Sequence, residues 1–370
     1  MAEQQPQLRI EKLLREMVNR NASDLHLRVG VPPVYRINGA LQRPFDIRVD
    51  SLMMDSFLDD IMNRDQKQRF EANKECDFAV GARDMGRFRV NVFRQRGTIA
   101  VVIRHIKAKI PAFEDLHLPE VIRDMSLTKR GLVLVTGTTG SGKSTTLAAM
   151  LDYINQNEAV NIITVEDPIE YLYRDNKSII SQREIGVDTL SYANALRAAL
   201  RQDPDVLLVG EVRDLETMQI ALTAADTGHM VFATIHTTNA TETIQRVLSM
   251  YPPHQHDEIR ILLSEVLAGI ISLRLLPTAD GKGRVPAAEV LVNTAAIKEY
   301  IRDKDKLSLV EHAIAEGHMQ YHSQTFDQAL LELYKTEQIS LETAMNAATN
   351  KDDFDLKIRG ISGTSDRGWM

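Results

Sequence analysis

The spacing of apolar residues near the start of the chain predicts a helix. Apolar side chains recur at every third or fourth position, as on one face of a helix, at Ile10, Leu13, Leu14, Met17 and Val18. From Leu25 to Val29 apolar residues then alternate with polar ones, which is typical of a half-buried strand. The chain therefore opens on a helix followed by a strand.

Further elements are expected before residue 107. Asp50-Ser51 can cap a helix over Leu52–Met62, and Asn38-Gly39 supplies two residues that tolerate the positive φ of a hairpin turn. Strand-like runs cover Asp77–Val80, Arg87–Phe93 and Thr98–Ile106. We expect residues 1–107 to form a small α+β domain.

After residue 119 the pattern changes to apolar strands that alternate with helices, which is typical of an α/β sheet. Strands are expected at Leu132–Val135, Asn161–Val165, Val206–Val209 and Met230–Ile235. Helices are expected at Lys143–Gln156, Tyr192–Arg201, Leu215–Asp226 and Ala240–Met250. This second domain is expected to cover residues 120–292.

Three segments lie outside these two domains. Residues 108–119 contain two prolines and little periodicity, which predicts a linker. Residues 293–359 are expected to form a helical extension, with amphipathic stretches at Ala295–Arg302, Leu307–Ala315, Phe326–Tyr334 and Leu341–Ala348. Residues 360–370 are small and polar, and we expect a disordered tail there.

Composition narrows the class of protein. The 370 residues carry a net charge of −7, which argues against a broad nucleic-acid-binding surface. The single cysteine, Cys76, excludes a disulfide or a cysteine-based zinc cluster within one chain. The N-terminus lacks the pattern of a signal peptide, and the longest apolar stretch, Ile261–Leu273, is too short to span a bilayer. We expect a soluble, cytoplasmic protein.

One segment is strongly basic although the chain as a whole is acidic. Between Gly81 and Lys107 lie one acidic residue, Asp84, and seven basic ones, namely Arg83, Arg87, Arg89, Arg94, Arg96, Arg104 and Lys107. A solvated strand face is one interpretation. The other is an arginine cluster directed at an anion such as a phosphate, because guanidinium groups bind phosphate through two hydrogen bonds.

The strongest chemical signal is a phosphate-binding loop. The segment matches the P-loop pattern GxxxxGK[ST] at every fixed position, and with the next residue it comprises Gly137, Thr138, Thr139, Gly140, Ser141, Gly142, Lys143, Ser144 and Thr145. A strand precedes it and a helix follows, as the pattern requires. In such a loop Lys143 reaches the β- and γ-phosphates of ATP and Ser144 ligates Mg²⁺. The alternative is a glycine-rich turn with an accidental lysine.

Two more strands end in acidic residues. Val206–Val209 is followed by Gly210 and Glu211, and we assign Glu211 to orienting and deprotonating the attacking water. An exposed acid at a strand end is the alternative interpretation. The strand Asn161–Val165 is followed by Glu166 and Asp167, which suit metal coordination through water or cap the following turn.

A fourth strand has a histidine at each end. His229 precedes Met230–Ile235 and His236 follows it. A lone histidine in such a place is most often structural. Because His236 is the fourth polar group at a strand end of one sheet, it becomes a candidate sensor of the γ-phosphate.

Together these motifs resemble the secretion-ATPase superfamily, and within it the PilT/PilU group of type IV pilus retraction ATPases. The resemblance is carried by four ordered segments, namely Gly137–Ser144, Thr164–Glu170, Val206–Glu211 and Gly228–Thr238, and also by Ala22–Leu27, Arg201–Asp205 and Glu211–Asp214. It implies a PAS-like N-terminal domain, a RecA-like P-loop ATPase domain and a ring-shaped homo-hexamer. It further implies a cytoplasmic protein, peripheral at the inner-membrane pilus machine, that acts on a PilC-like platform protein.

The resemblance also implies roles for individual residues. The glutamate of the second segment falls on Glu166, expected to help hold Mg²⁺, and the catalytic glutamate falls on Glu211. The histidines of the fourth segment are His229 and His236. N-terminal arginines reach the nucleotide in that family, which here implies Arg89, Arg96 and Arg104.

One stretch departs from the family. Retraction ATPases carry a C-terminal helix that reads Ala-Ile-Arg-Asn-Leu-Ile-Arg-Glu, needed for pulling, whereas this chain reads AIKEYIRD over residues 296–303. Three alternatives to independent retraction therefore stay open. They are an assembly or type II secretion ATPase, an accessory ATPase that depends on a paralogue, and a nucleic-acid translocase. Assembly ATPases commonly carry a four-cysteine zinc insertion, so Cys76 alone argues for retraction, and a translocase is disfavoured by the acidic charge.

Overall fold

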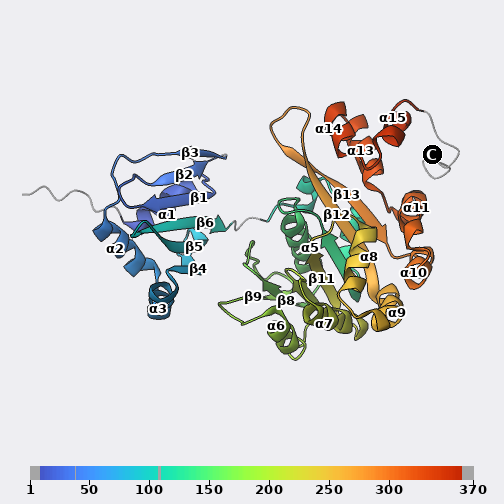
Figure 1. The fold of residues 1–370 in the computed structure, drawn as a ribbon, viewed down its shortest axis with the longest axis horizontal. Coiled ribbons are helices and arrows are strands. Elements are labelled where there is room, and N and C mark those ends of the chain that lie inside the picture. Colours follow the sequence, from blue (N-terminus) through green and yellow to red (C-terminus); the bar gives the residue numbers. More distant parts are fainter. Residues whose placement is uncertain (1–8, 38, 107–109, 361–370) are drawn as a thin grey trace, which may run out of the picture. The chain divides into compact units, whose positions relative to one another are not determined.

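The computed structural model describes residues 9–37, 39–106 and 110–360, and it divides the chain into two compact units with the main boundary between residues 109 and 110. Figure 1 shows both units, the first in blue to teal and the second in green to red. Asn38 of the predicted hairpin turn, Lys107 of the predicted basic cluster, residues 108–109 of the predicted linker and residues 361–370 of the predicted tail lie outside the described residues.

The first unit contains an antiparallel six-stranded sheet with the strand order β3-β2-β1-β6-β5-β4. Its strands are β1 (Asp24–Arg28), β2 (Val34–Ile37), β3 (Ala40–Gln42), β4 (Glu75–Ala82), β5 (Gly86–Gln95) and β6 (Thr98–Ile106). Alternate residues of β5, such as Phe88, Val90 and Val92, are fully buried, while their neighbours are half-buried. One face of the sheet therefore packs on the core and the other is more open.

The described residues of this unit also form the helices α1 (Ile10–Asn19), α2 (Ser51–Ile61) and α3 (Arg64–Asn73). The apolar face of α1 is buried in the same core as the sheet, which confirms the predicted opening helix. Asp50 caps α2 by accepting a hydrogen bond from the backbone nitrogen of Met53, also as predicted. Helix α3 was not predicted, because Phe70 is its only buried residue and it shows no apolar stripe.

The second unit contains a seven-stranded sheet with the order β13-β12-β7-β11-β10-β8-β9. Its strands are β7 (Gly131–Thr136), β8 (Asn161–Glu166), β9 (Ile179–Glu184), β10 (Val206–Val209), β11 (Met230–Ile235), β12 (Leu267–Pro277) and β13 (Arg284–Val292). All pairs are parallel except β12 with β13. The four strands predicted from apolar runs are thus present, and β9, β12 and β13 extend the sheet at its two edges.

Helices cover both faces of this sheet. Those of the core are α4 (Glu120–Ser126), α5 (Lys143–Asn157), α6 (Tyr192–Ala199), α7 (Leu215–Asp226), α8 (Ala240–Ser249) and α9 (His256–Val266). Alternate residues of the central strand β7 face different clusters, Leu132 and Leu134 on one side and Val133 and Val135 on the other. A strand that is buried on both faces reads as a continuous apolar run, which is why β7 was predictable.

The C-terminal part of the second unit is helical, as predicted. It comprises α10 (Ala295–Arg302), α11 (Val310–Glu316), α12 (His318–Tyr321), α13 (Phe326–Lys335), α14 (Leu341–Ala347) and α15 (Lys351–Ile358). Helices α13 to α15 enclose a small core with residues of β13, in which Phe326 and Phe354 are buried. The extension is therefore packed on the antiparallel edge of the sheet.

Part of the predicted linker is packed rather than free. Phe113–Leu116 forms a short 3-10 helix, and the Phe113 ring is buried in the core of the second unit. The guanidinium of Arg123 lies 5.1 Å from the centre of that ring. The described end of the segment, from residue 110, therefore belongs to the second unit.

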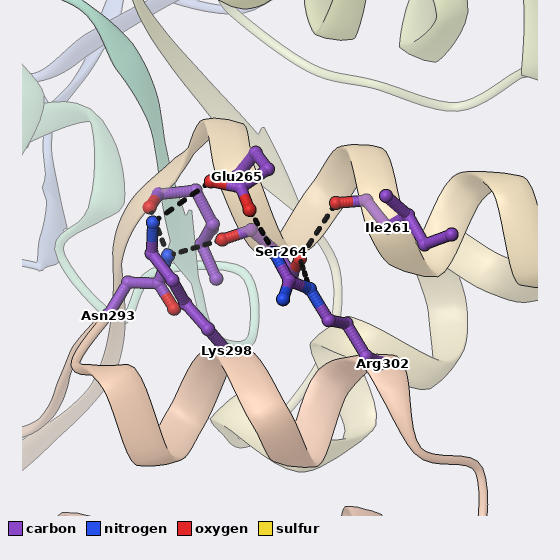
Figure 2. Close-up of polar contacts among 7 residues, drawn as sticks. Ile261, Ser264, Glu265, Asn293, Lys298 and Arg302 are labelled. Atoms are coloured by element: carbon purple, nitrogen blue, oxygen red, sulfur yellow. Dashed lines mark hydrogen bonds and ion pairs between the residues drawn. The ribbon is translucent and has the colours of Figure 1, made fainter.

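Ion pairs connect helix α10, whose sequence departs from the family pattern, with helix α9 (Figure 2). Lys298 and Arg302 both pair with Glu265, at 3.1 Å in the case of Lys298, and the Arg302 Nε donates to the Ser264 hydroxyl at 2.9 Å. Hydrogen bonding from Lys298, with the nearby charge of Arg302, lowers the pKa of Glu265 below its ordinary value. Lys298 thus supplies a cation where the family pattern has arginine.

Within residues 9–37, 39–106 and 110–360, none of the helices combines the length and the apolar character that crossing a membrane would require.

We predict that burial of apolar side chains, rather than the ion pairs, fixes α10. Ile301 is fully buried, so Ile301→Ala should cost about 2–5 kcal/mol of stability and lower the urea midpoint clearly. Glu265→Ala removes exposed ion pairs, and its smaller effect should vanish in high salt. Equal losses for both variants at high salt would contradict this assignment.

Candidate nucleotide site

The P-loop residues lie in a strand–loop–helix turn of the second unit. Strand β7 ends at Thr136 and helix α5 begins at Lys143. Gly137 has φ +135°, and a β carbon there would lie 2.5 Å from the carbonyl oxygen of Leu273 and from the Ser141 hydroxyl. Only glycine fits this close approach of two backbone segments. The loop geometry therefore depends on Gly137.

Donors gather in this loop. The Lys143 ammonium is buried and donates to the carbonyl oxygens of Gly137 at 2.8 Å and Thr138 at 3.0 Å. The Ser141 hydroxyl is buried, and among the described residues it has no hydrogen-bond partner. Thr138, Thr139 and Gly140 form the exposed top of the loop, and Ser144 and Thr145 lie half-buried in the first turn of α5. A cation, a hydroxyl and a helix N-terminus at one place fit a phosphate group.

Glu211 is brought to the same edge of the sheet by a tightly packed turn after β10. A β carbon on Gly210 would lie 3.0 Å from the Val165 carbonyl oxygen and 3.2 Å from the Tyr192 hydroxyl, so a side chain at the position before Glu211 would be tightly crowded. The Gly210 nitrogen donates to Val165, and the Thr234 hydroxyl donates to the Gly210 carbonyl at 2.5 Å. The neighbouring strands thus fix the start of this turn.

The Glu211 carboxylate has two polar neighbours. Arg213 donates to its Oε2 at 2.6 Å, and the Nε2 of His236 lies 3.2 Å from its Oε1. The hydrogen bond from Arg213 holds the pKa of Glu211 below its ordinary value, helped by the charge of Lys143 and opposed by partial burial. Glu211 is therefore ionised at neutral pH.

Glu166 ends strand β8 in a buried, hydrogen-bonded position. Its Oε1 accepts hydrogen bonds from the Thr164 hydroxyl at 2.6 Å and from the Gln182 amide at 3.2 Å. Among the described residues no group of three or more histidine, cysteine, aspartate or glutamate side chains could hold a metal ion by itself. A magnesium site built from Ser144, Glu166, water and phosphate oxygens does not need such a group, because Mg²⁺ commonly keeps several waters.

The two histidines predicted for the site lie at opposite ends of strand β11. The parallel register pairs Met230 with Gly131 and Ile235 with Thr136, so His236 follows β11 on the P-loop side. His229 precedes β11, and its Nδ1 lies 2.9 Å from the carbonyl oxygen of Ala224. Strands rise about 3.3 Å per residue, so seven residues separate the two histidines by roughly 20 Å. The structure does not bring His229 to this site.

The three predicted arginines all belong to the first unit. Arg89 and Arg104 are direct cross-strand partners, and Arg104 also pairs with Asp24 at 2.8 Å. Hydrogen bonds from Ser23 and Arg104 lower the pKa of Asp24 despite its burial. Arg96 is exposed in the turn between β5 and β6, with φ +48°. Arg104 is thus engaged by a carboxylate.

Sequence reasoning did not assign three residues of this site. Arg213 contacts Glu211, while Thr164 and Gln182 contact Glu166. Arg213 and Thr164 each lie two positions from the acid that they contact, and in extended chain this spacing puts side chains on one face. That spacing was the available signal for both. Gln182 comes from the unpredicted strand β9, and no local pattern indicates it.

Comparisons with known proteins identify relatives that match most of this chain. A family described as Type II/IV secretion system protein matches residues 2–352. The type IV pilus ATPase PilU of Pseudomonas aeruginosa is 42% identical over 355 residues, which are 95% of this chain and 92% of that protein. The type IV pilus retraction ATPase PilT of the same organism is 44% identical over 93% of this chain and 99% of that protein.

A solved structure of the pilus retraction motor PilT with bound ADP has a TM-score of 0.87 to this chain, at 46% identity over 94% of this chain and 98% of that one. This likeness confirms the predicted fold class, an α+β unit followed by a P-loop α/β unit with a helical extension. It also confirms the resemblance to the PilT/PilU group. The chain belongs to the Type II/IV secretion system protein family.

Proposed function

We propose that this chain is a motor ATPase that hydrolyses ATP to ADP and phosphate and thereby powers type IV pilus retraction, that is, pilin depolymerisation and twitching motility. The observation that carries the proposal is the gathering of Lys143, Glu211 and His236 at one edge of the sheet. The similarity to PilT over nearly the whole chain supports it.

The P-loop binds the phosphates of ATP. Its residues are Gly137, Thr138, Thr139, Gly140, Ser141, Gly142, Lys143, Ser144 and Thr145. Backbone N–H groups of the loop and the N-terminus of α5 point at the phosphate oxygens. The Lys143 ammonium exchanges the two loop carbonyls that it now contacts for the β- and γ-phosphates.

Glu211 orients the water that attacks the γ-phosphate. Its lowered pKa keeps it ionised, so it accepts a hydrogen bond from water over the whole neutral range. The same lowered pKa makes it a weak base, and it therefore accepts the proton late, after charge has moved to the leaving group. Arg213 fixes the carboxylate, and His236 senses the γ-phosphate through its contact with Glu211.

Ser144 and Glu166 are the residues that would hold Mg²⁺, Glu166 through water. A bound Mg²⁺ neutralises charge on the β- and γ-phosphates. Thr164 and Gln182 hold the Glu166 carboxylate in one orientation, as outer partners of metal ligands commonly do.

Catalysis is completed by assembly into a homo-hexamer, in which arginines of the first unit stabilise charge that develops on the phosphates. Arg89, Arg96 and Arg104 are the proposed arginines, and Arg104 leaves Asp24 when it takes this role. His229 is proposed to act at another surface, because it lies away from this chain's P-loop.

The proposed domains are residues 1–107, PAS-like, and 120–292, RecA-like, with 108–119 as linker, 293–359 as helical extension and 360–370 as tail. The motor works at the cytoplasmic side of the inner membrane on a PilC-like platform protein, without nucleic acid. Its close likeness to PilU as well as PilT, together with its altered α10, favours one second candidate, an accessory retraction ATPase that works beside a paralogue.

Complementation tests the function. In a strain that lacks its retraction ATPases, this chain should restore twitching and pilus shortening, while Lys143→Ala should not. Rescue only when a PilT-like paralogue is also present would establish the accessory function. Restored pilus assembly without shortening would instead contradict retraction.

Glu211→Gln should reduce the ATPase rate by about 10²-fold or more, because the amide cannot accept the proton of the attacking water. Binding of ATP should persist, since Glu211 does not hold the phosphates. Glu216→Gln, at a surface ion pair with Arg197, is the matched control and should keep the rate. Near-normal turnover in Glu211→Gln would place the base elsewhere.

Assembly should make the ATPase rate depend on protein concentration. The rate per chain should rise as hexamers form and should follow the mass measured by light scattering in the same samples. A rate per chain that stays constant well below the assembly threshold would remove the contribution of neighbouring subunits.

A further inference from the structure

A buried carboxylate lies outside the set of residues that we propose for binding and hydrolysis. Glu289 is on β13 and only 5% exposed. Its Oε1 accepts a hydrogen bond from the backbone nitrogen of Ala240 at 2.7 Å and one from the Ser272 hydroxyl at 3.4 Å. Burying a carboxylate is unfavourable. A glutamate at this position therefore points to a task beyond packing.

The register of the sheet connects Glu289 with the edge that carries the P-loop. Glu289 pairs with Ser272 of β12, Ser272 with Thr136 of β7, and Thr136 with Ile235 of β11. Residues in register on neighbouring strands lie on one face of the sheet. Thr136 directly precedes the P-loop and Ile235 directly precedes His236. The row of paired residues that begins at Glu289 therefore includes the residue before the P-loop and the residue before His236.

The hydrogen bond to Ala240 fixes the place where α8 begins. Ala240 is the first residue of α8, and its N–H is one of the groups that a helix cannot satisfy internally. A carboxylate at a helix N-terminus is also favoured by the helix dipole. Glu289 thus acts from another strand as a cap, beside the local cap Asn239.

The segment before α8 carries His236. Only three residues separate His236 from Ala240. The first of them, Thr237, is buried and shares a hydrogen bond with the Thr243 hydroxyl of α8 at 2.7 Å. A shift of the start of α8 would therefore move His236, whose Nε2 lies 3.2 Å from Glu211.

We propose that Glu289 is a positioning residue for ATP hydrolysis, which caps α8 and thereby holds the segment 236–239, and with it the contact between His236 and Glu211, in place. This inference rests on the proposed ATPase function and adds to it a residue that does not touch the nucleotide.

The burial of Glu289 makes its hydrogen bond with the Ala240 nitrogen dependent on pH. Burial raises the pKa of Glu289 from its ordinary value near 4.5 to about 7, against the hydrogen bond from Ala240. Of the charged groups that face it, Glu311 of α11 raises the pKa further and Arg274 of β12 lowers it. The ionised carboxylate is the stronger acceptor, so the cap tightens as pH rises through about 7.

The same raised pKa gives a second signature, which does not involve activity. The unfolded chain releases the proton near pH 4.5 and the folded chain releases it only near pH 7. The contribution of Glu289 to stability therefore declines as pH rises from about 4.5 to about 7, and it is constant above that range.

The experiment compares Glu289→Ala and Glu289→Gln with the full wild-type chain. Glu289→Ala loses the acceptor for Ala240, and its kcat should fall about tenfold while the KM for ATP changes less than about threefold. The kcat of the wild-type chain should rise with pH near pH 7, as the cap tightens. Glu289→Gln keeps an acceptor oxygen but cannot ionise, so its kcat should stay within about threefold of wild type at pH 6 and should not rise near pH 7. Glu311→Gln, the matched control, should keep the rise and move it to lower pH.

Two outcomes would overturn the inference. One is a folded Glu289→Ala chain with wild-type kcat. The other is a Glu289→Gln chain with the wild-type pH profile, which decides the matter even where Glu289→Ala does not fold. The urea midpoint does not depend on activity, so it tests this inference separately from the proposed function. The midpoint of the wild-type chain contains a decline from Glu289 between pH 4.5 and 7, and this decline should be weaker in Glu289→Gln. A wild-type chain without ATPase activity would contradict the proposed function alone.

Discussion

The parallel pairing of β7, β8, β10 and β11 is the constraint on which the site depends. In a parallel sheet every strand ends at the same edge, so the residues that follow these strands meet regardless of their distance along the chain. The loop after β7, Glu166, Glu211 and His236 are each the continuation of one such strand. Buried apolar side chains on both faces hold the register.

The sequence was sufficient to predict those parts of the site in which the chemistry requires a particular residue type. A P-loop needs Gly137 and Lys143 at fixed spacing, and the buried strands around it read as unbroken apolar runs. Strand β12 was missed, because the apolar stretch Ile261–Leu273 contains both the end of α9 and the start of β12. No periodicity marks that change.

Contacts set by strand register could not be predicted. Arg104 was chosen for an anion, yet its partner in the first unit is Asp24, eighty residues earlier and directly opposite on β1. His229 and His236 lie seven residues apart in one short segment, and the extended strand between them carries them to opposite edges of the sheet. The contact of Arg104 depends on pairing between distant segments, whereas the separation of the two histidines already follows from the strand predicted between them.

The most direct test of the account is a structure of this chain with a non-hydrolysable ATP analogue and Mg²⁺. The account predicts that the phosphates lie in the loop 137–144 and that the Lys143 ammonium leaves the carbonyl oxygens of Gly137 and Thr138 for phosphate oxygens. The Glu211 carboxylate should then face the γ-phosphate. Phosphates bound at another edge of the sheet, or an unchanged Lys143, would contradict it.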